Sequence, residues 1–120
     1  MYRIDFYRDE NGRSELQDFI DSLWTASSKS KDAHVQYERI AMQIKLLCEH
    51  GTNLPSQYTK HITEDIWELR PGKNRILYFC WLDDTFVLLH YFQKKTEKTP
   101  VREIERAKRE RDEYLRRQTR

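Results

Sequence analysis

Apolar residues recur at helical spacing in two segments of the N-terminal half. Four of them, separated by three and four positions so that they share one helix face, predict a helix over residues 14–24: Leu16, Phe19, Ile20 and Leu23. A longer stripe of the same kind predicts a second helix over residues 32–50: Tyr37, Ile40, Ala41, Ile44, Leu47 and Cys48. Ser14 followed by Gln17 has the form of a capping box, and Gly51 is suited to end the second helix.

The pattern changes to strands at the N-terminus and again after residue 64. Residues 2–7 alternate loosely between apolar and polar side chains and predict a first strand. Runs of aliphatic and aromatic residues, separated by the turn signals Pro71-Gly72 and Asp83-Asp84, predict three more strands: residues 65–70, 75–82 and 86–92. Because strands joined by such short turns are antiparallel neighbours, we expect these three to lie side by side.

The last predicted helix starts at Pro100, and its thin apolar line is broken at Arg111 within a dense field of charge. A helix this polar is expected to be only lightly docked on the sheet, or docked on something else. The order of elements predicts an α+β fold, in which two N-terminal helices cover one face of an antiparallel sheet and a basic helix ends the chain. No linker or repeat is found, so residues 1–120 are expected to form one domain.

Composition favours a soluble, cytoplasmic protein without a membrane partner. Hydrophobic residues make up 38% of the chain, and no apolar run approaches the roughly 20 residues that span a bilayer. The first ten residues lack the apolar core of a signal peptide. Cys48 and Cys80 show no paired spacing, so we expect two small buried side chains rather than a disulfide.

The net charge of +2 conceals an asymmetry. Residues 94–120 contain eleven Lys and Arg against six Asp and Glu, whereas the rest of the chain is slightly acidic. A basic segment of this kind favours a polyanion or an acidic protein as partner. From charge alone, an ion-paired and solvated helix face explains the same pattern.

Motifs of common enzyme sites are missing from the sequence. It has no Gly-rich phosphate loop and no GxSxG nucleophile elbow, and its four histidines lack the spacing of metal ligands: His34, His50, His61 and His90. No cofactor and no metal are therefore expected. What remains is a group of cations, because Arg70 and Arg75 bracket one hairpin end and the basic loop 93–100 follows the last strand to the same end.

These cations suit a phosphodiester, and the aromatic residues near them suit RNA. Guanidinium groups donate hydrogen bonds in a fork that matches phosphate oxygens. Aromatic rings such as Tyr78 and Tyr91 can stack on unpaired bases, and Lys94 and Lys98 are expected to be general RNA contacts. The residues therefore predict RNA binding, with cleavage as its extension.

RNA cleavage by the neighbouring 2′-hydroxyl needs a base, cations that stabilise the phosphate and an acid for the leaving 5′-oxygen, and in principle no metal. Arg70, Arg75 and Lys95 are the expected phosphate-stabilising residues. Glu68 or His90 is the candidate base, with a Lys or His as acid. Two structural alternatives stay open: Glu68 can simply pair with a neighbouring arginine, and His90 can be a packed strand histidine.

The residues around this site resemble the phage-derived HigB branch of the RelE-like toxins. The shared pattern is W-E-L-R from Trp67, a turn, R-x-x-Y from Arg75, and then an apolar strand that ends in F-x-K-K-T-x-K-T-P before a charged helix. The resemblance implies a RelE-like α+β fold and the toxin half of a type II toxin–antitoxin pair. Such a toxin is an endoribonuclease that cleaves messenger RNA on the ribosome without a metal and inhibits translation. A HigA-type helix-turn-helix antitoxin neutralises it, and operator DNA is bound only through that antitoxin.

The resemblance also implies roles for three cations. Arg75 matches the arginine that follows the hairpin turn and contacts the scissile phosphate, Lys95 replaces a second phosphate-stabilising arginine, and Arg70 matches a basic residue of the preceding strand. Compared with RelE itself, the strand lysines are replaced by Ile66 and Glu68, and the late catalytic tyrosine has no match. These departures favour the alternative function, a non-catalytic nucleic-acid-binding module or an inactive toxin relative of the same fold.

Overall fold

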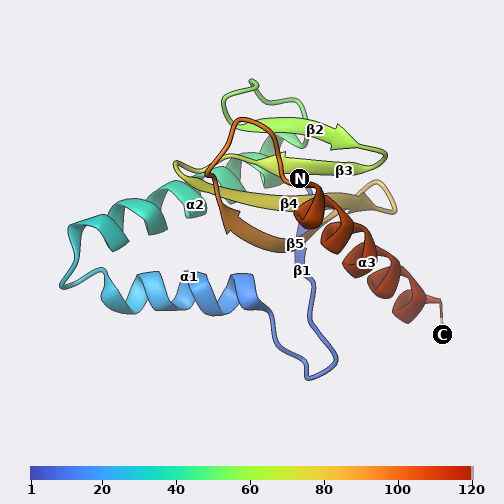
Figure 1. The fold of residues 1–120 in the computed structure, drawn as a ribbon, viewed down its shortest axis with the longest axis horizontal. Coiled ribbons are helices and arrows are strands. Elements are labelled where there is room, and N and C mark those ends of the chain that lie inside the picture. The colour runs from blue at the N-terminus through green and yellow to red at the C-terminus, as the bar shows by residue number, and fades with distance from the viewer. Residues whose placement is uncertain (120) are drawn as a thin grey trace.

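A five-stranded sheet forms the centre of the protein (Figure 1). The computed structural model describes residues 1–119. Along the sheet, the strands follow the order β1 (Arg3–Phe6), β5 (Thr85–Gln93), β4 (Asn74–Trp81), β3 (Ile66–Leu69) and β2 (Thr59–Thr63). The predicted α+β class is confirmed.

The sheet is mixed, whereas a wholly antiparallel one was expected. β1 runs parallel to β5, and all other neighbouring strands are antiparallel. The reason is the length of the connection. A tight turn forces the next strand to run back, but β1 is separated from β5 by two helices and three strands, so its direction is not fixed by a turn.

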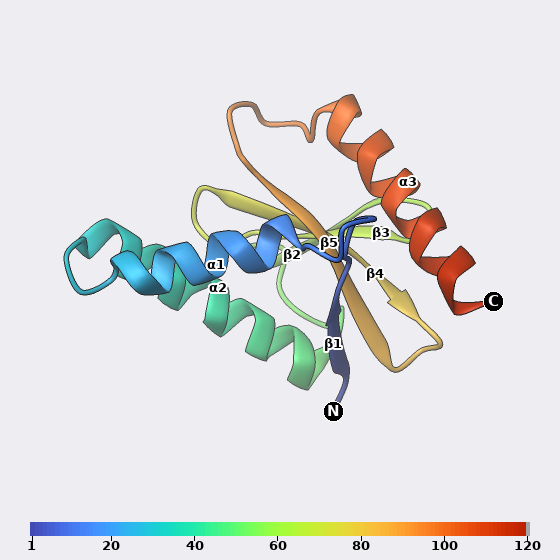
Figure 2. The same cartoon turned by 90° about the horizontal axis from the view of Figure 1, so that it is seen from below.

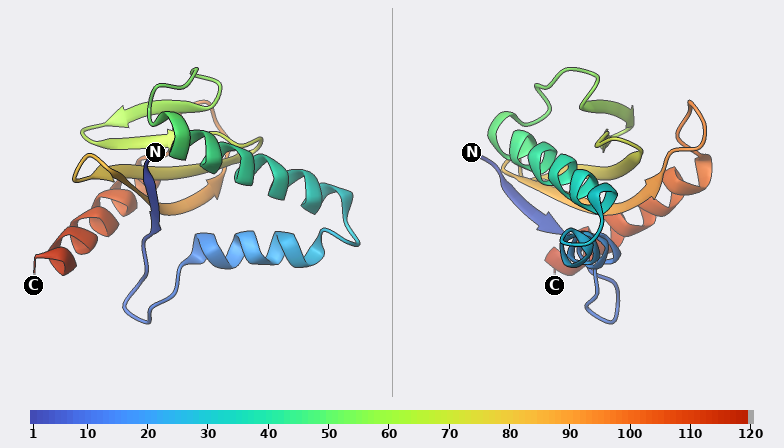
Figure 3. Two further views of the ribbon diagram at one scale, coloured as in Figure 1. Left: turned by 180° about the vertical axis from the view of Figure 1, so that it is seen from behind. Right: turned by 90° about the vertical axis from the view of Figure 1, so that its left-hand side faces the viewer.

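Helices cover both faces of this sheet (Figure 2, Figure 3). The hairpin of α1 (Glu15–Ala26) and α2 (Lys31–His50) packs on one face, and α3 (Val101–Gln118) packs on the other. Ser14 caps α1 by accepting a hydrogen bond from the backbone N–H of Gln17 at 3.1 Å, which satisfies one of the free donors at the helix start. All three helices lie where the sequence predicts them. Within residues 1–119, no helix is long and apolar enough to cross a membrane.

Two apolar cores result, one on each side of β4 and β5. Under α1 and α2, one core includes Leu16, Ile40, Leu47, Ile76, Tyr78 and Leu88. Under α3, the other includes Leu77, Phe79, Val87, Leu89, Ala107 and Tyr114. Burial on both faces explains why β4 and β5 are nearly continuous apolar runs rather than alternating ones.

The expected burial of both cysteines is wrong for Cys80. This residue is exposed, because it lies near the end of β4 and outside both apolar cores. Cys48 is half-buried, and its thiol donates a hydrogen bond to the carbonyl of Tyr2 at 3.0 Å. Both thiols are free.

The strand β2 was missed by the sequence prediction. Its five residues, TKHIT, include only one large apolar side chain and occupy the edge of the sheet, where one side of the strand has no neighbour. Edge strands often carry lysine, which discourages pairing with another chain, and here Lys60 has that position. This strand matters for the site because it lies directly beside β3.

We predict that Leu47→Ala lowers the free energy of unfolding by about 2–5 kcal/mol, because Leu47 is fully buried in the core under α2 and its truncation leaves a cavity. Met42→Ala in the same helix, at an exposed position, should change it by less than about 0.5 kcal/mol. Urea denaturation of both variants measures the difference. Equal losses would contradict the placement of α2.

Candidate active site

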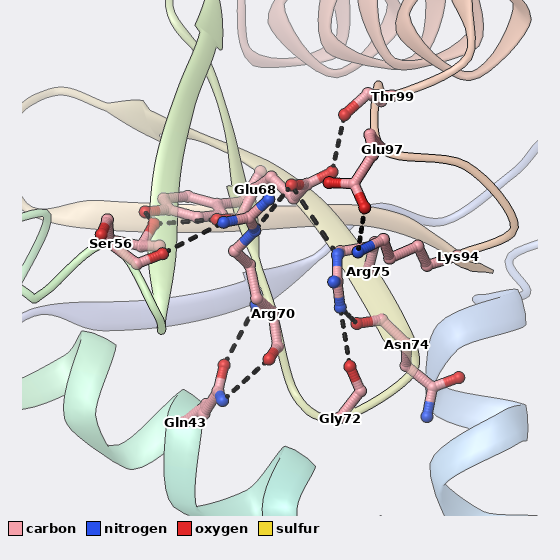
Figure 4. A network of polar contacts seen from close by, with 12 residues as sticks. Gln43, Ser56, Glu68, Arg70, Gly72, Asn74, Arg75, Lys94, Glu97 and Thr99 are labelled. Atoms are coloured by element: carbon pink, nitrogen blue, oxygen red, sulfur yellow. Dashed lines mark hydrogen bonds and ion pairs between the residues drawn. The ribbon is translucent and has the colours of Figure 1, made fainter.

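A buried carboxylate, Glu68 of β3, is the centre of the candidate site (Figure 4). Only 2% of this residue is exposed. Its Oε2 atom lies 3.2 Å from Nε of Arg70 and 3.9 Å from Nε of Arg75. Its Oε1 atom accepts a hydrogen bond of 2.8 Å from the hydroxyl of Thr99. Because a buried charge is costly unless it is paired, these three partners explain how the carboxylate is accommodated.

The β3–β4 turn fixes the guanidinium of Arg75. Its Nη1 atom donates to the carbonyl oxygens of Gly72 and Asn74, each at 2.8 Å. Gly72 has a φ of +61°, a backbone conformation that glycine adopts without strain. Burial lowers the pKa of Arg75, and the charge of Arg70 lowers it further, while Glu68 opposes both effects. An arginine so shifted is still a cation at neutral pH.

Helix α2 fixes the backbone of Arg70 through the side chain of Gln43. The side-chain amide of Gln43 donates to the Arg70 carbonyl and accepts from its backbone N–H, both at 3.1 Å. The guanidinium of Arg70 donates a hydrogen bond of 3.2 Å to the carbonyl of Ser56, in the turn that precedes β2. Both arginines are therefore held by backbone groups as well as by Glu68, so their positions are set before any ligand binds.

A cleft of about 180 Å³ opens next to Glu68 and Arg70. Lys60, Lys98, Thr99 and Ile104 also line it. Lys60 is paired directly opposite Glu68 in the β2–β3 register, so its side chain lies on the same face of the sheet. This lysine was not predicted to belong to the site, because β2 itself was not predicted. The alternation of Thr59, Lys60 and His61 was the available signal, but no long apolar run supported it.

Of the predicted loop cations, only one lines this cleft. Lys98 lines it together with Glu68 and Arg70. Lys95 lies in an adjoining groove that shares Lys98 and Thr99 with the cleft. Lys94 pairs with the exposed Glu97 at 3.8 Å. The structure therefore brings together three of the five predicted catalytic residues (Glu68, Arg70 and Arg75), whereas a fourth, Lys95, lies in the adjoining groove.

His90 does not belong to this site, and its predicted role as acid or base is wrong for this arrangement. It is fully buried beneath α3, with Nδ1 2.7 Å from Glu110 and Nε2 3.1 Å from Glu103. A bulge in the β4–β5 pairing causes this placement, because the register skips Leu89. Leu89 and His90 consequently both face α3, as residues of a bulge can. The alternative, a packed strand histidine, describes what is observed.

Tyr78 and Tyr91 lie on the opposite face of the sheet, so their predicted stacking on RNA at this site is wrong. Tyr78 is fully buried under the N-terminal helices, with its hydroxyl 2.6 Å from that of Thr59, and burial raises its pKa. Tyr91 stacks on Phe19 of α1, with ring centroids 4.1 Å apart. Residues an odd number apart on a regular strand face opposite sides, so Arg75 and Tyr78 cannot share a surface.

Ion pairs hold α3 on the body of the protein. Arg111 contacts Glu64 and Asp65 in the β2–β3 turn, and Arg106 contacts Glu15 of α1. Although burial opposes it, hydrogen bonding to Asp65 raises the pKa of Arg111. Helix α3 therefore docks on the sheet through these ion pairs as well as through its few buried side chains, among them Ala107 and Tyr114. Among residues 1–119, no group of three or more His, Cys, Asp or Glu side chains is arranged to hold a metal ion.

Comparisons with known proteins identify relatives of the chain. A family model described as phage-derived protein Gp49-like (DUF891) matches residues 28–112. The fold is similar to that of RelE in the archaeal RelE–RelB complex from Pyrococcus horikoshii, with 17% identity, a TM-score of 0.50, and coverage of 77% of this chain and 93% of that one. It also matches the YoeB dimer from Staphylococcus aureus at 11% identity and a TM-score of 0.49, covering 79% of this chain and 98% of that one. No curated protein matches the sequence significantly.

We predict that Gln43→Met lowers the free energy of unfolding by about 1–2 kcal/mol, because the Arg70 carbonyl loses its donor in a partly buried position. Gln57→Met, at an exposed position, should cost less than about 0.5 kcal/mol. Chemical denaturation of the two variants compares them. If they are equally stable, the bonds from Gln43 do not position Arg70.

Proposed function

This chain belongs to the phage-derived Gp49-like family, and we propose that it is the toxin of a type II toxin–antitoxin pair, an endoribonuclease that inhibits translation by cleaving messenger RNA. The observation that carries the proposal is the buried carboxylate of Glu68, flanked by the guanidiniums of Arg70 and Arg75 beside a cleft lined by Lys60 and Lys98. A base surrounded by fixed cations is the set of groups that cleavage through a 2′-hydroxyl requires. The RelE-like fold supports the same assignment.

In the proposed reaction, Glu68 accepts the proton of a ribose 2′-hydroxyl, and that oxygen attacks the adjacent phosphorus. The bond to the 5′-oxygen breaks, which leaves a 2′,3′-cyclic phosphate on one fragment and a 5′-hydroxyl on the other. Arg70 and Arg75 stabilise the charge that develops on the phosphate oxygens. The ammonium groups of Lys60 and Lys98 are the proton donors available for the leaving oxygen.

The contacts of Glu68 are expected to change when a substrate binds. In the free protein, its two carboxylate oxygens are occupied by Nε of Arg70 at 3.2 Å and by the hydroxyl of Thr99 at 2.8 Å. A bound phosphodiester competes for the same guanidinium hydrogen bonds, because arginine binds phosphate and carboxylate with the same fork. Substrate binding therefore releases Glu68 for proton transfer at the moment when it is needed.

The proposal includes a cellular compartment and a protein partner. We assign the protein to the cytoplasm, where ribosomes supply messenger RNA, and no metal is required by the reaction as written. The RelE structure is described as a complex with RelB, which supports an antitoxin partner. The phage-derived HigB resemblance makes a HigA-type helix-turn-helix protein the expected one. Lys94, Lys95 and Lys98 would contact the RNA on either side of the cleaved bond.

We predict that Glu68→Gln reduces cleavage of messenger RNA in a reconstituted translation reaction by roughly 10²- to 10⁴-fold, the range for loss of a general base. Glu49→Gln is the matched control, because this glutamate in the last turn of α2 is exposed and lies outside the cleft. Primer extension on the message measures cleavage, and thermal unfolding confirms that both variants are folded. Full activity of Glu68→Gln would remove Glu68 as the base. A wild-type protein that binds RNA but leaves the message intact would favour the alternative, a non-catalytic nucleic-acid-binding module.

We predict that the gene next to this one encodes a small helix-turn-helix antitoxin, whose co-expression restores growth to cells arrested by the toxin. The two proteins should also co-purify as a complex. Growth arrest that is absent on induction of the wild-type chain, or unchanged in Arg75→Ala, would contradict the toxin assignment.

A further inference from the structure

A second concave surface adjoins the Glu68 cleft. This groove of about 690 Å³ lies where β5, the following loop and the start of α3 meet, and it shares Lys98 and Thr99 with the cleft. A volume of this size is typical of small-ligand sites. The cleavage chemistry proposed above takes its base and its proton donors from the cleft, so the apolar part of the groove has no role in that chemistry.

The groove combines apolar walls with a cationic rim. Phe92, Pro100 and Val101 provide the apolar surface, and Lys95, Lys98 and Arg102 provide the charge. Val101 is 72% exposed. The carboxylate in the groove, Glu103, is already engaged by His90 at 3.1 Å and by Arg102 at 3.7 Å. A ligand with a flat apolar part and negative charge beside it fits this composition.

The strand register connects the groove to the cleft. Phe92 is paired directly opposite Arg75 in the β4–β5 ladder, so the two side chains leave the sheet on the same face, with Cβ atoms about 4.5–5.5 Å apart. Arg75 is the proposed contact of the scissile phosphate. A group that packs on Phe92 is therefore close to that phosphate, as the base of an adjoining nucleotide is.

We propose that this groove holds an unstacked nucleobase of the substrate RNA, next to the scissile phosphate, against Phe92, Pro100 and Val101. The inference rests on the proposed function and gives it a second binding site. Aromatic and apolar side chains hold single-stranded bases by stacking, while cations follow the backbone on either side. Gln93, at the end of β5 on the same groove, offers an amide that can donate to and accept from the edge of the base.

The test is binding of an RNA that cannot be cleaved. A short single strand with 2′-O-methyl groups throughout has no hydroxyl for the attack, and a matched strand with abasic nucleotides in the centre keeps the same charge. At low salt, fluorescence anisotropy should show that removing the bases weakens binding to the wild-type protein about tenfold or more. Val101→Glu should abolish this preference for bases, and Phe92→Ala should do so too if thermal unfolding shows that it is folded.

Leu82→Glu is the matched control. It introduces the same charged side chain at an apolar residue that is 70% exposed, in the turn at the other end of the β4–β5 hairpin, and the preference for bases should persist there. Equal binding of both strands to the wild type, or an unchanged preference in Val101→Glu, would overturn the inference. Loss of antitoxin binding in Val101→Glu with RNA binding intact would assign the groove to a protein instead.

Failure of this inference can be told apart from failure of the proposed function. Cleavage that depends on Glu68, together with equal binding of the two strands, would leave the nuclease standing and remove the base site. A preference for bases without any cleavage of messenger RNA would leave the base site standing and remove the nuclease.

Discussion

Compensation of one buried charge organises the site and the elements around it. The carboxylate of Glu68 is almost completely buried, so the structure must bring it hydrogen-bond donors. They come from the end of β3, from β4 and from the loop before α3: Arg70, Arg75 and Thr99. The β3–β4 turn and α2 hold these donors in turn, through backbone carbonyls and through the amide of Gln43. Helix, hairpin and loop thereby meet at one carboxylate.

Stability alone does not explain such a cluster. Buried ion pairs can often be replaced by apolar side chains of similar volume at little cost or with a gain in stability, whereas loss of one partner costs about 3–5 kcal/mol. This chain already buries β4 and β5 under helices on both faces. Apolar side chains in place of the buried ion pairs would therefore also have a core to pack against. A fixed base among fixed cations instead reduces the reorganisation that a reaction requires, which is the benefit expected for phosphodiester cleavage.

Local patterns in the sequence were sufficient for the helices and for the β3–β4 hairpin, and hence for Glu68, Arg70 and Arg75. The remaining site residues depend on features that are not local. Lys60 lies on an edge strand without an apolar run, so only a weak alternation of side chains marked it. His90 turned toward α3 because of a bulge that depends on the pairing of β4 with β5. The error at Tyr78 was avoidable, since its odd separation from Arg75 on one strand already places the two side chains on opposite faces.

The ends of the cleaved message test the proposed chemistry most directly. Fragments made by the wild-type protein in a translation reaction would be examined for the group at each new end. Attack by the 2′-hydroxyl with Glu68 as base predicts a 2′,3′-cyclic phosphate on the upstream fragment and a 5′-hydroxyl on the downstream one, which polynucleotide kinase labels without prior phosphatase treatment. A 5′-phosphate on the downstream fragment would mean that water was the nucleophile, and it would contradict the role proposed for the Glu68 site.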